Sequence, residues 1–162
     1  MLDLLDQYLC GCNTSRKRSL IMSSHNGIIL KTFKDRTKTR IFKKKVVTAT
    51  FGFFDIDKIM IPVHDNSHWT LYVIFIQSKD IVHYDSLALA EPTTLTYSDI
   101  LAYLEDEACA ANIPFLTSEW SYLRATVINQ VNTLDCGFCV IKHGILVMHD
   151  LPLNLQVRIV YA

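Results

Sequence analysis

The sequence lacks an apolar run long enough to cross a bilayer. Its longest apolar stretches, residues 70–76 and 145–148, are far shorter than the roughly 20 residues that a membrane-spanning helix needs. The first residues, MLDLLDQYL, also lack the basic region ahead of an apolar core that marks a secretory signal. We therefore expect an intracellular protein, in the nucleus or cytoplasm, that is not secreted and has no membrane partner.

The sequence also lacks a disulfide framework. Its 5 cysteines are odd in number and are not densely spaced, unlike those of small secreted domains. We expect reduced thiols, no cofactor and no metal, and a buried packing role for Cys10, Cys12 and Cys109.

Repeats and low-complexity segments are absent as well. Half of the 162 residues are hydrophobic and a fifth are charged, which is enough apolar material for a substantial core and argues against disorder. A single domain spanning residues 1–162 is the simplest interpretation.

The charges are balanced overall but unevenly placed. Residues 1–45 contain eleven Lys and Arg against three Asp and Glu, a net charge of +8, and residues 46–162 contain five against thirteen, a net charge of −8. The basic segment could meet an acidic partner, but no aromatic residues are interleaved in it at regular spacing to stack bases. Nucleic acid is therefore not the expected partner.

Hydrophobic periodicity predicts a mixed α+β order. The run HWTLYVIFI is apolar on both faces, as in a central strand, and FCVIKHGILVMHD is apolar nearly all round, as in a buried helix. The predicted strands are 45–54, 58–63, 68–76, 81–85 and 122–128, the predicted helices are 2–9, 97–111 and a helix from Gly137 onward, and 153–160 is a strand or a closing helix.

The predicted hairpin at residues 68–85 brings two polar side chains together. If its loop holds an even number of residues centred on the QS pair, Asp85 lies opposite Thr70 and on the same face as His68. Diagonal neighbours of this kind are about 7–8 Å apart at the backbone, so a carboxylate can reach an imidazole. Such a carboxylate would fix the orientation of the ring, as a general base requires.

The segment QVNTLDCGFCV supplies a nucleophile. Asp135 is a reasonable N-cap, which places Cys136 in the first helical turn, where free amide groups and the helix dipole favour a thiolate. Gly137 leaves the backbone uncovered beside the sulfur, and Gln130, expected at the end of the preceding strand, offers a second donor to an oxyanion. Each residue alone could be structural, but the combination favours catalysis.

Three motifs, IPVHDNSHW, YDSL and QVNTLDCGFCV, resemble those of the ubiquitin-like protein proteases, the cysteine peptidases that mature and remove SUMO, NEDD8 and related modifiers. The resemblance spans about residues 58–143 and keeps the order His, Asp, Gln, Cys. It implies a papain-like α+β domain with a central mixed or antiparallel sheet and a buried helix that starts at the nucleophile.

The resemblance also implies a role for each site residue. Cys136 would attack the carbonyl of a C-terminal glycine, His68 would act as base and then acid, and Asp85 would orient His68. Gln130 would help to form the oxyanion hole, and Trp69 would cover the channel for the glycine tail, although it could equally be a core aromatic. The expected partners are SUMO, NEDD8 or ubiquitin and their conjugates, and the expected activity is that of a peptidase or isopeptidase, SUMO-type in the first instance.

Alternatives remain open. Met1-Leu2-Asp3-Leu4 stands where the family has a Trp-Leu-x-Asp motif, and the domain is expected to be shortened at both ends. Both points favour a non-catalytic module that binds a ubiquitin-like protein; a viral or bacterial effector peptidase is a further alternative. Cys136, Cys139 and His143, with His68 or Cys109 as a fourth ligand, could instead form a zinc site, but a Cys-x-x-Cys pair that runs into an apolar helix does not favour it.

Overall fold

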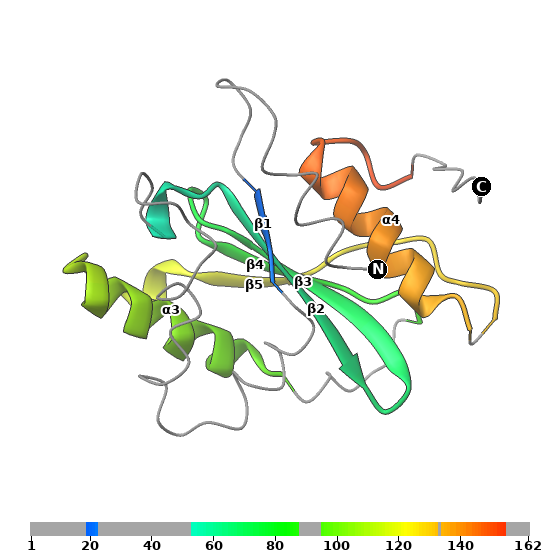
Figure 1. Ribbon diagram of the computed structural model, residues 1–162, viewed down its shortest axis with the longest axis horizontal. Helices are drawn as coiled ribbons and strands as arrows, with labels where there is room; N and C mark the ends of the chain where they lie inside the picture. Colours follow the sequence, from blue (N-terminus) through cyan, green and yellow to red (C-terminus); the bar gives the residue numbers. More distant parts are fainter. Residues whose placement is uncertain (1–18, 23–52, 88–94, 133, 155–162) are drawn as a thin grey trace.

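The computed structural model describes residues 19–22, 53–87, 95–132 and 134–154 (Figure 1). Several features predicted from the sequence lie outside these ranges. They are the helix at 2–9, nearly all of the basic segment, Cys10, Cys12, residues 45–52 of the strand predicted at 45–54, and most of the segment at 153–160.

The described residues form one mixed five-stranded sheet. The strands are β1 (Ser19–Ile21), β2 (Lys58–Asp65), β3 (His68–Phe75), β4 (Asp80–Tyr84) and β5 (Ser121–Arg124), and they lie side by side in that order. The β2–β3 and β3–β4 pairs are antiparallel, whereas β1–β2 and β4–β5 are parallel. This arrangement confirms the predicted α+β class and the predicted central mixed sheet.

Each face of the sheet is covered by one helix. Figure 1 shows α3 (Tyr97–Ala111) and α4 (Cys136–Met148) on opposite sides of the strands. Because side chains alternate along a strand, Tyr72 and Ile74 of β3 pack into the core on the α3 side, and Leu71 and Val73 pack into the core on the α4 side. This two-sided burial explains why HWTLYVIFI is apolar at successive positions.

Helix α3 has the bounds that the sequence predicted. Thr96 and Asp99 form a capping box, in which each side chain hydrogen-bonds the backbone N–H of the other residue. Asn112 ends the helix in the left-handed conformation. Ile100, Tyr103 and Leu104 form the buried stripe.

The turn between β2 and β3 places His68 at the start of its strand. The register pairs Asp65 with His68, so Asn66 and Ser67 form a two-residue loop. Both have positive φ angles, 47° and 64°, which match the right-handed twist of the flanking strands.

Helix α4 lies across β3 with its C-terminal end tied to β2. The buried Lys58 donates a hydrogen bond from Nζ to the carbonyl oxygen of Val147 at 2.6 Å and forms an ion pair with Asp150. A cation at this end of the helix compensates the carbonyl groups that have no intrahelical partner. The clamp fixes the helix whose other end carries Cys136.

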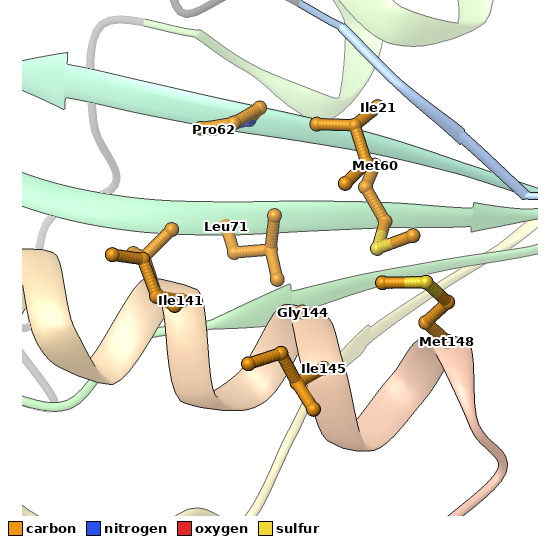
Figure 2. Close-up of a pocket in the computed structure, with 9 residues that line it drawn as sticks. Ile21, Met60, Pro62, Leu71, Ile141, Gly144, Ile145 and Met148 are labelled. Carbon is orange, nitrogen blue, oxygen red and sulfur yellow. The ribbon is translucent and has the colours of Figure 1, made fainter. Parts of the chain in front are cut away.

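An apolar pocket lies between α4 and the sheet (Figure 2). Its volume is about 40 Å³, room for only a few water-sized groups and far below the roughly 300–1,000 Å³ of ligand sites. Its lining is apolar, so it is not a site of chemistry. The residues are Ile21, Met60, Pro62, Leu71, Val140, Ile141, Gly144, Ile145 and Met148.

Three predictions about elements need correction, and one strand was missed. Residues 53 and 54, predicted as the end of a strand, belong to the short 3₁₀ helix Phe53–Asp55. The strand predicted at 122–128 ends at Arg124, the last residue with a register partner in β4, and Ala125 adds one backbone hydrogen bond to the carbonyl of His83. Helix α4 begins at Cys136, as the predicted N-cap at Asp135 requires, but it is buried along one stripe only rather than nearly all round, with Phe138 44% exposed. Strand β1 was not predicted, because three residues carry too short a pattern.

Candidate active site

His68 and Asp85 are hydrogen-bonded to each other, as the hairpin geometry predicted. The register pairs Leu71 with Tyr84, and the same register continued places Asp85 opposite Thr70. His68 Nε2 lies 2.8 Å from Asp85 Oδ1, and both residues are buried. The other ring nitrogen, Nδ1, is buried and has no hydrogen-bond partner among the described residues. The carboxylate therefore fixes the ring and leaves one nitrogen available for proton transfer.

Asp85 has further partners that hold its carboxylate in place. Oδ1 also accepts a hydrogen bond from the backbone N–H of Leu87 at 3.0 Å. The guanidinium of Arg124, on β5, lies 3.7 Å from Oδ2. Arg124 was not predicted from the sequence, because its contact with Asp85 depends on the parallel β4–β5 pairing.

Gln130 is hydrogen-bonded to Ser86, the residue that follows Asp85. Its backbone N–H donates to the carbonyl of Ser86 at 2.9 Å, and its Oε1 accepts from Ser86 Oγ at 2.6 Å. Its Nε2 donates to the carbonyl of Asn132 at 2.5 Å. Gln130 lies in the loop after β5 rather than at the end of a strand, and its amide group is engaged within that loop. Ser86 was missed as its anchor, although it forms part of the YDSL motif.

Asn132 shapes the turn that leads to the nucleophile. Its Oδ1 accepts hydrogen bonds from the backbone N–H groups of Leu134 at 2.8 Å and Asp135 at 3.0 Å, and its Nδ2 donates to Asp135 Oδ2 at 2.7 Å. Asp135 occupies the predicted N-cap position of α4, but its side chain makes no capping hydrogen bond. The predicted position of the N-cap was therefore correct, but Asp135 does not cap the helix with its side chain. Its carboxylate accepts a hydrogen bond from Asn132 instead.

Cys136 is the first residue of α4, and it is buried and not in a disulfide. No hydrogen bond joins it to His68, because within the described ranges His68 bonds only Asp85 through Nε2 and nothing through Nδ1. The structure thus joins His68 to Asp85 and Gln130 to Ser86, and it places Cys136 at a helix N-terminus.

Trp69 connects the His68 strand to the start of α4. Its indole packs against the imidazole of His64 at a centroid distance of 4.6 Å. A Cβ on Gly137 would lie 3.7 Å from Trp69 Cδ1, so the indole covers the backbone next to the nucleophile. Trp69 is half-buried, so it is neither fully exposed, as a channel cover alone would be, nor fully buried, as a core aromatic would be.

Two histidines near the site are buried in the fold. Burial lowers the pKa of His83 to about 4, with smaller effects from Asp85, Arg124 and His68. Burial also lowers the pKa of His143, on α4, to about 4. The ring of His143 faces Tyr84, whose pKa burial raises to about 12. All three groups are therefore neutral at pH 7.

The zinc alternative has no support in the described part of the chain. Within those ranges no three His, Cys, Asp or Glu side chains form a group that could hold a metal ion. Cys109, which we expected to be buried, is exposed on the last turn of α3. The apolar face of α3 is already filled by Ile100, Leu104 and Ala108.

None of the described helices is long and apolar enough to span a membrane.

The fold is the papain-like α+β fold that solved Ulp1-type protease domains share. Residues 20–160 match the family model for the Ulp1 protease family, C-terminal catalytic domain. Because this match covers most of the sequence, the chain belongs to the Ulp1 protease family, as the motifs indicated.

Curated relatives and solved structures agree with this membership. Ubiquitin-like-specific protease 1A of Arabidopsis thaliana is 37% identical over 92 residues, which are 55% of this chain and 18% of that protein. Sentrin-specific protease 2 of Pongo abelii is 27% identical over 111 residues, which are 66% of this chain and 18% of that protein. The chain thus spans less than a fifth of the length of these two relatives.

The fold is shared with solved SUMO protease domains. The Chaetomium thermophilum Ulp1-like SUMO protease catalytic domain superposes with a TM-score of 0.74 at 22% identity, covering 94% of this chain and 60% of that one. The C-terminal Ulp1 protease domain in complex with Smt3, the yeast orthologue of SUMO, gives a TM-score of 0.71 at 23% identity, covering 87% and 62%.

Proposed function

We propose that this chain is a cysteine peptidase and isopeptidase that cleaves after the C-terminal glycine of a ubiquitin-like modifier, of the SUMO type in the first instance. The observation that carries the proposal is the 2.8 Å contact between His68 Nε2 and Asp85 Oδ1, with Nδ1 of the same ring unpartnered among the described residues. Cys136 at the start of α4, in a member of the Ulp1 family, supplies the thiol.

The proposed reaction uses His68 as a proton carrier. Because Asp85 accepts the Nε2–H of the neutral ring, Nδ1 has a lone pair and takes the thiol proton of Cys136. The thiolate attacks the glycine carbonyl, His68 returns the proton to the leaving amine, and a thioester remains on Cys136. Water then hydrolyses the thioester with His68 again as base, which restores the thiol and releases the carboxylate.

Two further groups have proposed roles around the reacting carbonyl. The backbone N–H of Gly137 and the side-chain amide of Gln130 donate to the oxyanion. This role requires Gln130 Nε2 to leave the carbonyl of Asn132, to which it is bonded in the structure. Cys136 and His68 must also approach to hydrogen-bond distance, as apo sites commonly do on binding substrate.

The proposed substrate follows from the relatives and from Trp69. The relatives include Sentrin-specific proteases, and one similar structure contains Smt3. The indole of Trp69 lies over Gly137, where it narrows the approach to Cys136 so that a glycine tail passes and larger side chains do not. The partners would be SUMO, NEDD8 or ubiquitin and their conjugates, and the place of action would be intracellular, in the nucleus or cytoplasm.

A panel of modifiers carrying a thiol-reactive group at the C-terminus tests this proposal. SUMO, NEDD8 and ubiquitin probes are incubated with the chain, and the adduct is mapped by mass spectrometry. We expect a covalent adduct on Cys136, fastest with SUMO, that is lost in Cys136→Ser and slowed in His68→Ala. The matched control is Cys139→Ser, one turn along the same helix, which should label at the wild-type rate.

The second candidate function is a module that binds the modifier without cleaving it. The engagement of Gln130 Nε2 with Asn132, and the absence of a hydrogen bond between Cys136 and His68, favour it. Tight probe binding with no adduct in the wild type would establish this alternative and overturn the peptidase.

A further inference from the structure

The face of the sheet that carries the His68–Asp85 pair repeats the same geometry one step further along. Because Thr70 lies two residues after His68 and His83 two residues before Asp85, these two residues are diagonal neighbours in the same sense. Thr70 and His83 are each 1% exposed, whereas His68 is 8% and Asp85 is 7% exposed. The second pair is therefore deeper in the molecule than the first.

The two side chains of this second pair are too short to meet as the first pair does. Diagonal residues are about 7–8 Å apart at the backbone, and a threonine hydroxyl is attached directly to Cβ. In the first pair an imidazole and a carboxymethyl group close the gap to 2.8 Å. In the second pair, Thr70 Oγ1 and His83 Nε2 are both buried, and neither has a partner among the described residues.

The ring of His83 cannot turn to relieve this. It stacks on Tyr72 with a centroid distance of 4.2 Å and an interplanar angle of 10°, and its Nδ1 lies 3.3 Å from the hydroxyl of Tyr122. These two contacts fix the orientation of the ring and leave Nε2 as the nitrogen without a hydrogen-bond partner among the described residues. A buried polar atom that nothing bonds to destabilises the fold, and buried waters commonly supply the missing hydrogen bond.

We propose that Thr70 Oγ1 and His83 Nε2 bind one internal water molecule, directly behind the His68–Asp85 pair. The water bridges β3 and β4 at the point where the β3 backbone lies opposite Asp85. A water both donates and accepts, so it satisfies a hydroxyl and a neutral imidazole whichever tautomer the ring adopts. The bridge braces the end of β4 and so makes Thr70 and His83 positioning residues for Asp85.

The positioning role rests on the proposed function, whereas the water site does not. Crystal structures of the wild type, Thr70→Val and Thr70→Ser test the site directly. We expect one water within about 2.7–3.2 Å of both atoms in the wild type and in Thr70→Ser. It should be absent in Thr70→Val, which has nearly the same shape but no hydroxyl. A direct contact between Thr70 and His83 in the wild type, or a dry gap between them, overturns the proposal.

Steady-state kinetics on a cleavable SUMO substrate test the positioning role. We expect Thr70→Val to lower kcat about five-fold with KM unchanged, the effect of one lost hydrogen bond behind Asp85, and Thr70→Ser to restore it. Thr126→Val, at an exposed threonine outside the sheet, is the control and should match the wild type. An unchanged kcat in Thr70→Val overturns the positioning role. A wild type without activity but with the ordered water would reject the proposed function and retain the site.

Discussion

Asp85 joins three parts of the molecule at the scale of single residues. Its carboxylate bonds the imidazole of His68, accepts the backbone N–H of Leu87 and faces the guanidinium of Arg124 at 3.7 Å. Two of these partners stabilise a negative charge, and the third is held in one orientation by it. The charge and the geometry of Asp85 can therefore be tested separately.

Replacing Asp85 by Asn keeps the shape of the side chain and removes its charge. The amide can present its N–H groups to the imidazole and so favours the wrong tautomer, with Nδ1 protonated. We expect kcat/KM on a SUMO substrate to fall by about 10²–10⁴, by analogy with other His-orienting aspartates.

Asp80→Asn, at the other end of β4, is the matched control and should lose less than about two-fold. An Asp85→Asn variant that keeps wild-type kcat/KM would show that the His68–Asp85 contact is structural.

The site residues that lie on strands were predictable, because side chains alternate strictly between the two faces of a strand. The two-residue repeat of a strand fixed the face of His68 and Asp85 from the turn alone, so their contact followed from the sequence. The amide of Gln130 and the carboxylate of Asp135 were not predictable, because loop side chains choose among nearby partners that only the folded loop brings together. The exposure of Cys109 was also missed. Other side chains fill the buried face of α3, so Cys109 lies on the opposite, exposed face.

At the scale of elements, α4 depends on contacts at its two ends. Asn132 organises the turn before Cys136, and Lys58 binds the last turn through the carbonyl of Val147. The Lys58 side chain is 4% exposed, whereas its ion-pair partner Asp150 is 52% exposed. Lys58 therefore acts mainly as a buried cation at the C-terminus of the helix.

Lys58→Met should destabilise the fold through α4. The change retains the apolar part of the side chain but leaves the carbonyl of Val147 without its donor. We expect a loss of about 2 kcal/mol in the free energy of unfolding, measured by urea denaturation.

The control is Lys79→Met, which removes the exposed ion pair with Glu119 and should cost less than about 1 kcal/mol. Equal losses in the two variants would contradict the role of Lys58 as a helix clamp.

Helix α3 and the β3–β4 hairpin were predictable as elements, β5 was predicted at 122–128 with an end that is too late, and β1 was not predicted. The capping box at Thr96 and the residue in left-handed conformation at Asn112 are local signals that the sequence carries by itself. The strand residues of β5 are all exposed, and β1 has three residues, so neither has a pattern of alternating burial. Both exist because parallel partners in the sheet supply hydrogen bonds, which is non-local information.

At the scale of the whole molecule, buried histidines link stability to pH. Burial holds the pKa of His83 and of His143 at about 4 in the folded chain, below the ordinary value of 6.5. The unfolded chain therefore binds more protons between these values, and stability decreases as the pH falls through this window.

The expected loss at pH 5 relative to pH 8 is about 2 kcal/mol for each histidine. The free energy of unfolding at the two pH values measures it, and His143→Phe should remove about half of the difference due to the histidines. A His143→Phe variant with the same pH dependence as the wild type would contradict this account.

Charge distribution predicts a second property of the whole molecule. Because residues 1–45 carry +8 and residues 46–162 carry −8, binding of a modifier should have a strong electrostatic component. We expect the affinity for SUMO to fall as the salt concentration rises, measured by titration calorimetry. An affinity that is independent of ionic strength would show that the charges do not contribute.

The central claim is that Cys136 is a nucleophile, and hydrolysis of a SUMO C-terminal amide carrying a fluorogenic leaving group tests it most directly. The rates of the wild type, Cys136→Ser and Cys139→Ser are compared at equal concentration. The account predicts turnover that falls at least about 10³-fold in Cys136→Ser and stays within about three-fold in Cys139→Ser. Equal turnover in the wild type and Cys136→Ser would contradict it.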